Sequence, residues 1–255
     1  MQNDSLKFLG VIPARFASTR FPGKPLALIA GKTMIERVYF QATSAKSLTK
    51  VVVATDDVRI AEHINSFGGN VMMTNAGHQS GTDRCAEVVT KMEEHFDAVV
   101  NIQGDEPFIA PEQIDLLTAC LSESGTQIAT LIKLITDITE VLNSNSPKVV
   151  IGKNQEAMYF SRQAIPFLKG VEIESWLSHH RYYKHIGIYG YKTDILQQLS
   201  MLPQSALEKA ESLEQLRWLE NGFRIRTRIT EMETIAIDTP DDLIRAQGYA
   251  NQLAK

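Results

Sequence analysis

Residues 8–25 read FLGVIPARFASTRFPGKP. The first five are apolar, which predicts a buried strand over residues 8–12. The segment that follows combines Arg15, Arg20 and Lys24 with glycine, proline and small residues, so that backbone N–H groups can approach a ligand there. Such a loop suits a polyphosphate, although a solvated loop with surface ion pairs fits the composition equally well.

Strand, polar loop and helix alternate from residue 8 to residue 122. Apolar segments predict strands at residues 8–12, 50–54, 71–74 and 98–102. Helical periodicity follows each of them, near residues 34–47, 58–67, 82–95 and 111–122. This order is typical of an α/β fold in which helices cover both faces of a parallel sheet. Thr33 and Glu36 have capping-box spacing, so the first helix begins there and residues 13–32 form a long loop, a feature that is usually functional.

The pattern changes after about residue 127. Strand-like segments follow one another with few helices between them, at residues 128–134, 148–151, 157–161 and 183–191. They predict antiparallel structure inserted into the parallel sheet or flanking it. A helix at residues 206–221 ending before Gly222, a strand-like stretch reaching residues 235–237 and a helix from Thr239-Pro240 are also expected. Because no repeat or linker divides the chain, we expect one domain over residues 1–255.

Charge and composition exclude several classes of protein. The chain has 26 Lys and Arg against 30 Asp and Glu, a net charge of −4, whereas a general nucleic-acid binder needs a basic excess. Apolar stretches fall far short of the ~20 residues of a membrane helix, and residues 1–7 lack the order of a secretory signal, so a cytoplasmic protein without membrane insertion is expected. Cys85 and Cys120 form no CxxC pair and are expected to be buried in a reducing compartment.

Two common nucleotide-binding motifs are absent from the sequence. Gly31-Lys32-Thr33 matches the end of a P-loop, but Leu26 stands where that motif needs its first glycine. No GxGxxG occurs, so a dinucleotide-binding dehydrogenase is not expected.

Carboxylates follow two of the apolar segments. Asp105 and Glu106 come after the strand at residues 98–102, and Asp238 comes after residues 235–237. Ligands of open α/β sheets bind beyond the carboxyl ends of the strands, and Mg²⁺ takes one or two carboxylates together with substrate phosphates. A shared magnesium site is therefore one interpretation, and helix capping or loop hydrogen bonds are the ordinary alternative.

The segment at residues 74–84 offers hydroxyls, amides and glycine just before a helix. It could bind a base and ribose, although Ser80 or Thr82 as a helix N-cap explains it nearly as well. Among the histidines, surface or packing roles are expected for His179 and His180, and a substrate hydrogen bond is possible for His185.

Seven motifs in a fixed order make the chain similar to sugar-acid cytidylyltransferases, and together to the 3-deoxy-manno-octulosonate (Kdo) cytidylyltransferase family. They read IPARFASTRFPGKPL (12–26), HQSGTDR (78–84), NIQGDEP (101–107), YFSR (159–162), HIGIYGY (185–191), ESLEQLR (211–217) and DTP (238–240). The similarity runs from about residue 8 to residue 247. Phe16 in place of Tyr and Phe21 in place of Leu are mild variants that leave the catalytic positions intact.

The resemblance implies a fold, a reaction and a set of site residues. The fold would be a Rossmann-like, mixed and mostly parallel sheet of the nucleotide-diphospho-sugar transferase type. The anomeric hydroxyl of Kdo would attack the α-phosphorus of CTP, giving CMP-Kdo and pyrophosphate for lipopolysaccharide synthesis. Arg15, Lys24 and Asp105 would be catalytic, with Mg²⁺ held by Asp105 and Asp238. CTP would be bound by Ala14, Arg15, Arg20, Lys24, Gln79, Ser80 and Gly81, and the sugar acid by Gln103, Arg162, His185, Tyr189, Glu214 and Gln215.

The resemblance further implies that residues 128–191 form a sugar lid and the interface of a homodimer. Two alternatives stay open at this point. The acceptor could be a related sugar acid, either 8-amino-Kdo or a nonulosonic acid, because the triphosphate loop does not discriminate among them. The chain could also be a non-catalytic regulator that binds a sugar nucleotide.

Overall fold

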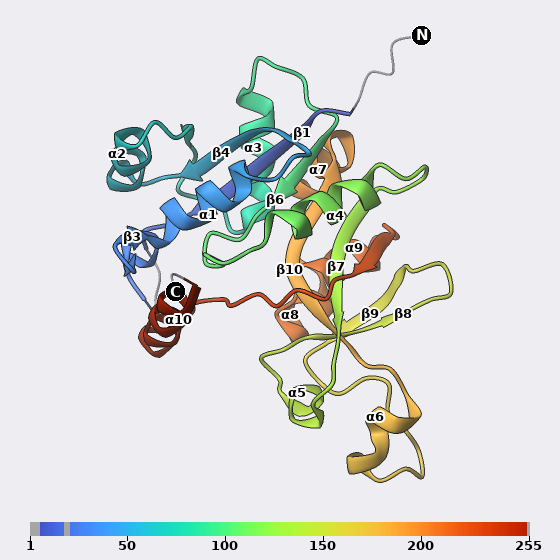
Figure 1. The fold of residues 1–255 in the computed structure, drawn as a ribbon. Helices are drawn as coiled ribbons and strands as arrows, with labels where there is room; N and C mark the ends of the chain where they lie inside the picture. Colours follow the sequence, from blue (N-terminus) through green and yellow to red (C-terminus); the bar gives the residue numbers. More distant parts are fainter. Residues whose placement is uncertain (1–5, 18–20, 254–255) are drawn as a thin grey trace. The chain divides into compact units, whose positions relative to one another are not determined.

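The computed structural model describes residues 6–17 and 21–253. Two compact units divide the chain: unit 1 comprises Met1–Asp115 and Glu233–Lys255, and unit 2 comprises Leu116–Met232. Most of their helices and strands are labelled in Figure 1. The single domain expected over residues 1–255 stays a prediction.

Unit 1 contains a parallel sheet in the order β6-β1-β4-β5. Its strands are β1 (Phe8–Ala14), β4 (Leu48–Thr55), β5 (Val71–Met73) and β6 (Ala98–Asn101). β1 pairs with both β4 and β6, and β4 pairs with β5, all in the parallel sense. Leu9, Val53 and Val99 are fully buried, as expected of central strands that are covered on both faces. The four predicted strands of this part of the chain are confirmed.

The helices of this region also follow the prediction. They are α1 (Met34–Thr43), α2 (Val58–Ser66), α3 (Gly81–Lys91), α4 (Pro111–Leu121), which continues into the residues of unit 2, and α10 (Pro240–Leu253). The Thr33 hydroxyl accepts the Glu36 N–H at 3.2 Å, which confirms the start of α1. The segment before α1 is more ordered than a plain loop, because it holds the 3₁₀ turn η1 (Lys24–Leu26) and the antiparallel pair β2 (Leu28–Ile29) and β3 (Lys32–Thr33).

Unit 2 is built on antiparallel pairing. Its strands are β7 (Ile128–Leu134), β8 (Lys148–Ile151), β9 (Ala157–Ser161), β10 (Tyr183–Lys192) and β11 (Ile225–Ile229). β10 is antiparallel to β7 and β8, β8 is antiparallel to β9, and only the β11–β7 pair among these is parallel. The predicted antiparallel region and the mixed α/β sheet are thus confirmed.

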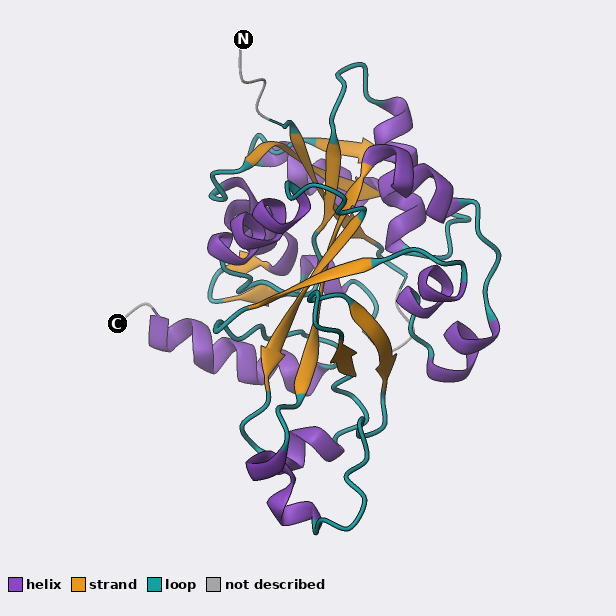
Figure 2. Ribbon diagram, turned by 90° about the vertical axis from the view of Figure 1, so that its right-hand side faces the viewer, coloured by secondary structure: helices purple, strands orange, loops and turns teal. Residues whose placement is uncertain are grey.

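The helices of unit 2 are short. They are α5 (Ile138–Leu142), η2 (Ile173–Ser175), α6 (Trp176–His179), α7 (Thr193–Ser200), α8 (Ala206–Glu211) and α9 (Gln215–Glu220). Figures 1 and 2 both show α5 and α6 beyond the ends of β7 and β10. Ile135, Val141, Trp176 and Tyr182 form a small apolar core there, which stabilises this extension.

Two predicted elements are wrong. The helix expected at residues 206–221 is split into α8 and α9, because Ser212 adopts the left-handed conformation with φ of 52° and ends α8. Residues 230–238 form neither helix nor strand, so the strand expected to reach residues 235–237 does not exist. Apolar periodicity reports burial, and a buried irregular segment such as the one around Ile237 has the same composition as a strand.

Over the described residues, no helix is both long enough and apolar enough to cross a membrane.

Candidate active site

Lys24 lies between two carboxylates in unit 1. Its ammonium is 2.8 Å from Oδ2 of Asp105 and 3.4 Å from Oδ1 of Asp238. The Lys24 side chain is only 15% exposed, whereas the two carboxylates are 29% and 45% exposed. The predicted catalytic lysine and the two predicted metal ligands therefore meet at one point, with the carboxylates reachable from solvent.

A backbone contact brings the two aspartates together. The N–H of Ile237 donates to the carbonyl oxygen of Asp105 at 2.9 Å, and the Ile237 side chain is fully buried. The N–H of Asp238 donates to Oδ2 of Asp242 in the first turn of α10 at 3.0 Å. Asp238 thus reaches the site from an irregular segment, which corrects the expectation that it follows a strand.

The donor set at this point suits a hard divalent cation. Within the described residues, no group of three or more His, Cys, Asp or Glu side chains could hold a metal by itself. Two carboxylates are nevertheless a normal protein contribution for Mg²⁺, which takes the rest of its oxygen ligands from water and substrate phosphates. Both carboxylates already contact one positive charge, the Lys24 ammonium.

Gly104 allows the Asp105 loop to reach the end of β1. A Cβ at this position would lie 2.7 Å from the carbonyl oxygen of Pro13, closer than backbone atoms tolerate. Just before Gly104, the pairing of β6 with β1 continues, since the N–H of Ile102 donates to the carbonyl oxygen of Val11 at 2.9 Å. Only glycine therefore lets Asp105 follow β6 directly into the site.

Glu106 and Asp105 are adjacent in sequence and differ sharply in environment. Glu106 is buried, and its Oε2 has no hydrogen-bond partner among the described residues. Burial, and secondarily the charge of Asp105, raises the pKa of Glu106 to about 8. The two neighbouring carboxylates therefore have different environments, and of the two Asp105 is the one that contacts Lys24.

Arg15 follows β1 and contacts the segment before α3. Its guanidinium donates to the backbone carbonyl of His78. Burial lowers the pKa of Arg15, and the nearby charge of Arg84 adds to this effect. Ala14, the last residue of β1, is buried opposite Thr55 of β4, so its position is fixed by the sheet. Arg20, also predicted to bind CTP, lies outside the described residues.

Residues 74–80, hereafter the 74–80 loop, connect β5 to α3. Ser80 is the N-cap of α3 and accepts the Asp83 N–H at 3.1 Å, while Asp83 accepts the N–H groups of Gln79 and Ser80 at 3.2 and 3.1 Å. The side-chain amide of Gln79 donates to Gly77 at 2.9 Å. A Cβ on Gly81 would lie 3.3 Å from Asn101 and Pro13, so this helix start packs closely against β1 and β6. The N-cap interpretation of Ser80 is confirmed, and nucleotide binding by these residues stays a prediction.

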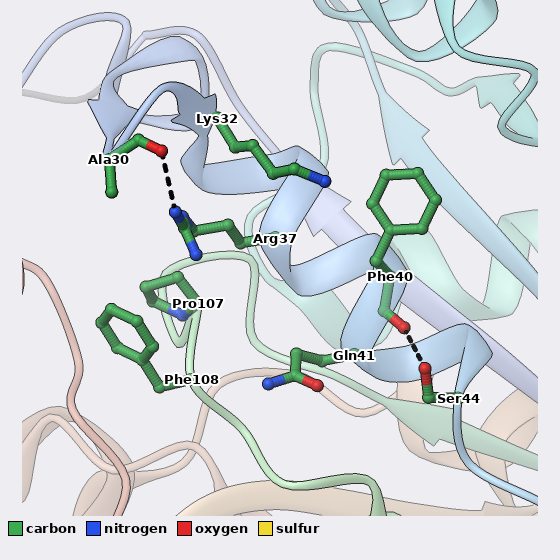
Figure 3. Close-up of a pocket in the computed structure, with 8 residues that line it drawn as sticks. All are labelled: Ala30, Lys32, Arg37, Phe40, Gln41, Ser44, Pro107 and Phe108. Atoms are coloured by element: carbon green, nitrogen blue, oxygen red, sulfur yellow. Dashed lines mark hydrogen bonds between the residues drawn. The ribbon is translucent and has the colours of Figure 1, made fainter. Parts of the chain in front are cut away.

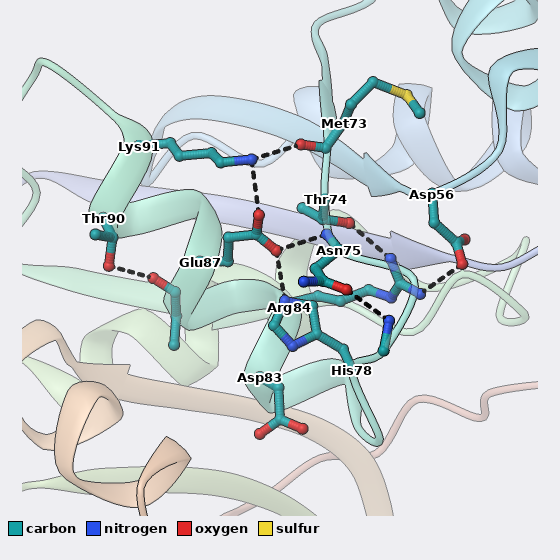
Figure 4. A network of polar contacts seen from close by, with 12 residues as sticks. Asp56, Met73, Thr74, Asn75, His78, Asp83, Arg84, Glu87, Thr90 and Lys91 are labelled. Carbon is teal, nitrogen blue, oxygen red and sulfur yellow. Dashed lines mark hydrogen bonds and ion pairs between the residues drawn. The ribbon is translucent and has the colours of Figure 1, made fainter.

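A polar network contacts the 74–80 loop (Figure 4). Arg84 is fully buried, donates to the Thr74 hydroxyl at 2.6 Å and lies 3.2 Å from Oδ2 of Asp56. Glu87 accepts from Asn75 N–H at 2.8 Å, from Lys91 at 2.7 Å and from the His78 ring. Burial opposes ionisation of Glu87, but the hydrogen bonds from Lys91, Asn75 and His78 outweigh it and lower its pKa to about 2.

Asp56, Glu87 and the role of Arg84 were not predicted from the sequence. Asp56 and Glu87 look like ordinary polar residues beside a strand and on a helix. For Glu87, its i, i+4 spacing to Lys91 was the one feature of the sequence that indicated an ion pair.

In unit 2, Arg162 is held by backbone carbonyls. Its guanidinium donates to Glu211 at 2.7 Å, to Ser144 at 3.1 Å and to Ser212 at 3.3 Å. The buried Lys148 holds the backbone of Arg162 in place. Its ammonium donates to the carbonyls of Asn143, Ser146 and Arg162, each at 2.7 Å. Among the described residues, three of the five N–H donors of Arg162 are thus engaged, which leaves two for a carboxylate.

His185 and Tyr189 lie together on β10. The His185 ring is 3.1 Å from the Thr130 hydroxyl and packs edge-on against Phe160. Burial lowers the pKa of His185 to about 3 and raises that of Tyr189 well above its usual value. Both side chains are therefore neutral near pH 7 and suited to hydrogen-bonding neutral hydroxyls.

Glu214 and Gln215 stand at the start of α9. Gln215 is buried, and its Nε2 has no hydrogen-bond partner among the described residues. A buried bidentate ion pair between Arg217 and Glu208, at 2.6 and 2.8 Å, joins α9 to α8 and sets the position of this helix start. Gln103, the remaining predicted sugar ligand, follows β6 in unit 1.

The two cysteines and the histidines at positions 179 and 180 pack or make contacts within the protein. Cys85 and Cys120 are both buried, as expected. The His179 ring contacts the Ser175 carbonyl at 2.8 Å, and the His180 ring packs edge-on against Tyr182.

A pocket of about 330 Å³ lies alongside α1 (Figure 3). Its lining consists of Ala30, Lys32, Arg37, Phe40, Gln41, Ser44, Pro107 and Phe108, which include none of the predicted site residues. Both of its cations have partners, because Arg37 donates to Ile29 at 2.8 Å and Lys32 lies 3.4 Å from Glu36. This pocket is separate from the Lys24 contacts.

Comparison with known proteins identifies the family. A family model described as Cytidylyltransferase matches residues 9–229. A 3-deoxy-manno-octulosonate cytidylyltransferase of Phocaeicola vulgatus is 56% identical over 250 residues, covering 97% of this chain and 98% of the relative. One of Geobacter sulfurreducens is 46% identical over 244 residues, covering 93% and 97%.

Two solved structures extend the comparison. The structure of a CMP:2-keto-3-deoxy-manno-octonic acid synthetase complexed with CTP superposes with a TM-score of 0.90 at 41% identity, covering 97% of this chain and 99% of that one. A 4-diphosphocytidyl-2C-methyl-D-erythritol synthase of Anaerococcus prevotii, at 14% identity, a TM-score of 0.62 and 96% coverage of both chains, shares the fold alone. The chain belongs to the 3-deoxy-manno-octulosonate cytidylyltransferase family.

Proposed function

We propose that this protein transfers the cytidylyl group of CTP to Kdo, releasing pyrophosphate and forming CMP-Kdo for lipopolysaccharide synthesis. The observation that carries the proposal is the contact of Lys24 with Asp105 and Asp238, which combines a phosphate-binding cation with two metal-binding carboxylates. The names of the full-length relatives support the choice of substrates.

In the proposed reaction, the anomeric hydroxyl oxygen of Kdo forms a bond to the α-phosphorus of CTP. The bond from that phosphorus to the pyrophosphate oxygen breaks, and the hydroxyl proton passes to solvent. Such a transfer needs charge neutralisation and in-line positioning more than covalent help. Arg15 and Lys24 offset the negative charge on the phosphates, and Arg20 is assigned to the same task.

Asp105 and Asp238 are proposed to hold Mg²⁺. When bound, Mg²⁺ supplies Lewis acidity toward phosphate and hydroxyl oxygens. Ala14 through its backbone, with Gln79, Ser80 and Gly81, is proposed to read cytosine and ribose. The capping box of Ser80 and Asp83 fixes the backbone at Ser80 and the start of α3 before the nucleotide binds.

The sugar acid is assigned to Gln103, Arg162, His185, Tyr189, Glu214 and Gln215. The guanidinium of Arg162 suits the carboxylate of Kdo. His185 and Tyr189 are neutral near pH 7, because burial shifts both of their pKa values away from ionisation, and they suit its hydroxyls. We further propose a cytoplasmic homodimer, with residues 128–191 as sugar lid and dimer interface.

A pyrophosphate-release assay with CTP, Mg²⁺ and a panel of sugar acids tests the proposal. Release with Kdo at the highest kcat/KM of the panel is expected, and Lys24→Ala serves as the matched inactive variant. A higher kcat/KM with 8-amino-Kdo or a nonulosonic acid would reassign the acceptor. Binding of CTP without release from any acceptor would instead indicate a regulator.

A further inference from the structure

Two acids on one face of α3 hold the 74–80 loop at its two ends. Asp83 accepts the N–H groups of Gln79 and Ser80 at the end of the loop. Glu87, four residues later and therefore on the same face, accepts the Asn75 N–H at its start at 2.8 Å. Hydrogen bonds to two carboxylates of one helix therefore hold both ends of the loop.

Glu87 is the centre of the contacts at the start of the loop (Figure 4). Its Oε2 accepts from both Asn75 N–H and the His78 ring, and its Oε1 lies 2.7 Å from the Lys91 ammonium. Lys91 in turn donates to the carbonyl of Met73, the last residue of β5, at 3.0 Å. Strand end, loop and helix are therefore joined through one carboxylate.

His78 connects Glu87 to Arg15, one of the predicted catalytic residues. Its ring contacts Glu87, while its backbone carbonyl accepts from the guanidinium of Arg15. The residues next along the chain are Gln79 and Ser80, whose backbone is held by Asp83. A change in the position of His78 would therefore displace a phosphate-binding cation and the base-reading residues together.

We propose that Glu87 is a positioning residue for CTP: acting through His78, it fixes Arg15 and the 74–80 loop in the arrangement that binds the nucleotide. Glu87 itself touches no substrate in this proposal. The inference depends on the proposed function only in taking CTP as the nucleotide.

The test compares Glu87→Ala, His78→Ala and the double variant with wild type. CTP affinity is measured by calorimetry with Mg²⁺ and without any sugar acid, and KM values for CTP and Kdo are measured by pyrophosphate release. Each single variant is expected to weaken CTP binding about tenfold, which is the size of one charge-assisted hydrogen bond. The double variant is expected to show the same tenfold loss, because both substitutions break one chain of contacts. The KM for Kdo is expected to stay unchanged.

Two further variants sharpen the comparison. Glu87→Gln keeps an amide oxygen for the Asn75 N–H and gives up the negative charge, so a loss smaller than that of Glu87→Ala is expected. Glu62→Ala, which removes an exposed glutamate from α2, is the matched control and should bind CTP like wild type.

Wild-type CTP affinity in folded Glu87→Ala or folded His78→Ala would overturn the inference, as would losses that multiply to about a hundredfold in the double variant. If Glu87→Ala does not fold, Glu87→Gln with His78→Ala and their double variant provides the same cycle. A wild-type protein that binds CTP without transferring it to Kdo would refute the proposed reaction, while the affinity comparison would still decide the role of Glu87.

Discussion

The carbonyl oxygen of Asp105 accepts the backbone N–H of Ile237 at 2.9 Å, which joins the loop after β6 to the segment before α10. These segments are more than a hundred residues apart in the chain, and each carries one of the two carboxylates that contact Lys24. A main-chain hydrogen bond therefore joins the two segments that carry these carboxylates.

Asp105→Asn is expected to reduce kcat at saturating CTP at least ~10³-fold while leaving the fold intact, because the amide can neither neutralise a divalent cation nor pair with Lys24. Steady-state pyrophosphate release and thermal unfolding measure the two effects. The matched control is Asp241→Asn, the same change at an exposed position in the first turn of α10. Near-normal turnover of Asp105→Asn with Mg²⁺ would remove Asp105 from the metal site.

Lys24→Ala is expected to lose at least ~3 kcal/mol of transition-state stabilisation, the usual cost of removing a charge-stabilising donor. The loss should be visible in kcat as well as in kcat/KM for CTP. Lys32→Ala, at a more exposed lysine paired with Glu36, should have little effect. A rise in KM alone would mean that Lys24 binds ground state and transition state equally.

Gly104→Ala is expected to destabilise the protein by about 1–3 kcal/mol, because its new Cβ would lie 2.7 Å from a backbone oxygen that cannot rotate away. Urea unfolding measures the change. Gly248→Ala, within α10, is the matched control: its Cβ meets nothing within 4 Å, so the helix should gain about 1 kcal/mol. Equal stability of the two variants would contradict the close approach at Gly104.

The stability of the protein should fall with acid because of His185. Its pKa is lowered to about 3 in the folded state from 6.5, so between these values the unfolded chain binds a proton that the folded protein excludes. This contribution is fully present above pH about 6.5 and is lost as the pH falls toward 3, by at most about 1.4 kcal/mol per pH unit.

His185→Gln should remove that slope from a plot of unfolding free energy against pH. His95→Gln, at a side chain that is 81% exposed, should leave the slope unchanged. An identical acid dependence in wild type and His185→Gln would show that another group titrates.

Arg217→Met is expected to cost about 3–5 kcal/mol of stability, because it leaves the buried carboxylate of Glu208 without its bidentate partner. Glu208→Met combined with Arg217→Met should cost much less, since it leaves no buried charge unpaired. Denaturant unfolding of the single and double variants decides between these outcomes. Equal costs would mean that packing, and not charge, holds α8 against α9.

Much of the fold could be predicted from the sequence, because burial on both faces leaves a direct pattern. The bounds of β7, β8 and β9 match the predicted segments, and Thr33 begins α1 as its capping pattern indicates. Ser212 could not be predicted, because a single left-handed residue leaves the apolar periodicity on either side undisturbed.

The site could be predicted in part. Lys24, Asp105 and Asp238 were identified by residue type and position, and the structure brings them together. The reason for their meeting, a hydrogen bond between two backbones, is independent of side-chain identity and so leaves no trace in composition. Glu106 could not be told apart from Asp105, since neighbours in sequence can differ in burial. Glu87 was missed because an acid on a helix usually faces solvent.

The ammonium of Lys24 acts as an internal counterion of the site. With one positive charge placed against two negative ones, the site has its negative charge partly compensated before anything binds. If the proposed metal site is right, a divalent cation at the carboxylates would release this ammonium for another anion, and a triphosphate that attracts the ammonium would free the carboxylates for a cation. Thermodynamic linkage makes this exchange reciprocal, so metal ion and nucleotide should each increase the affinity for the other by the same factor.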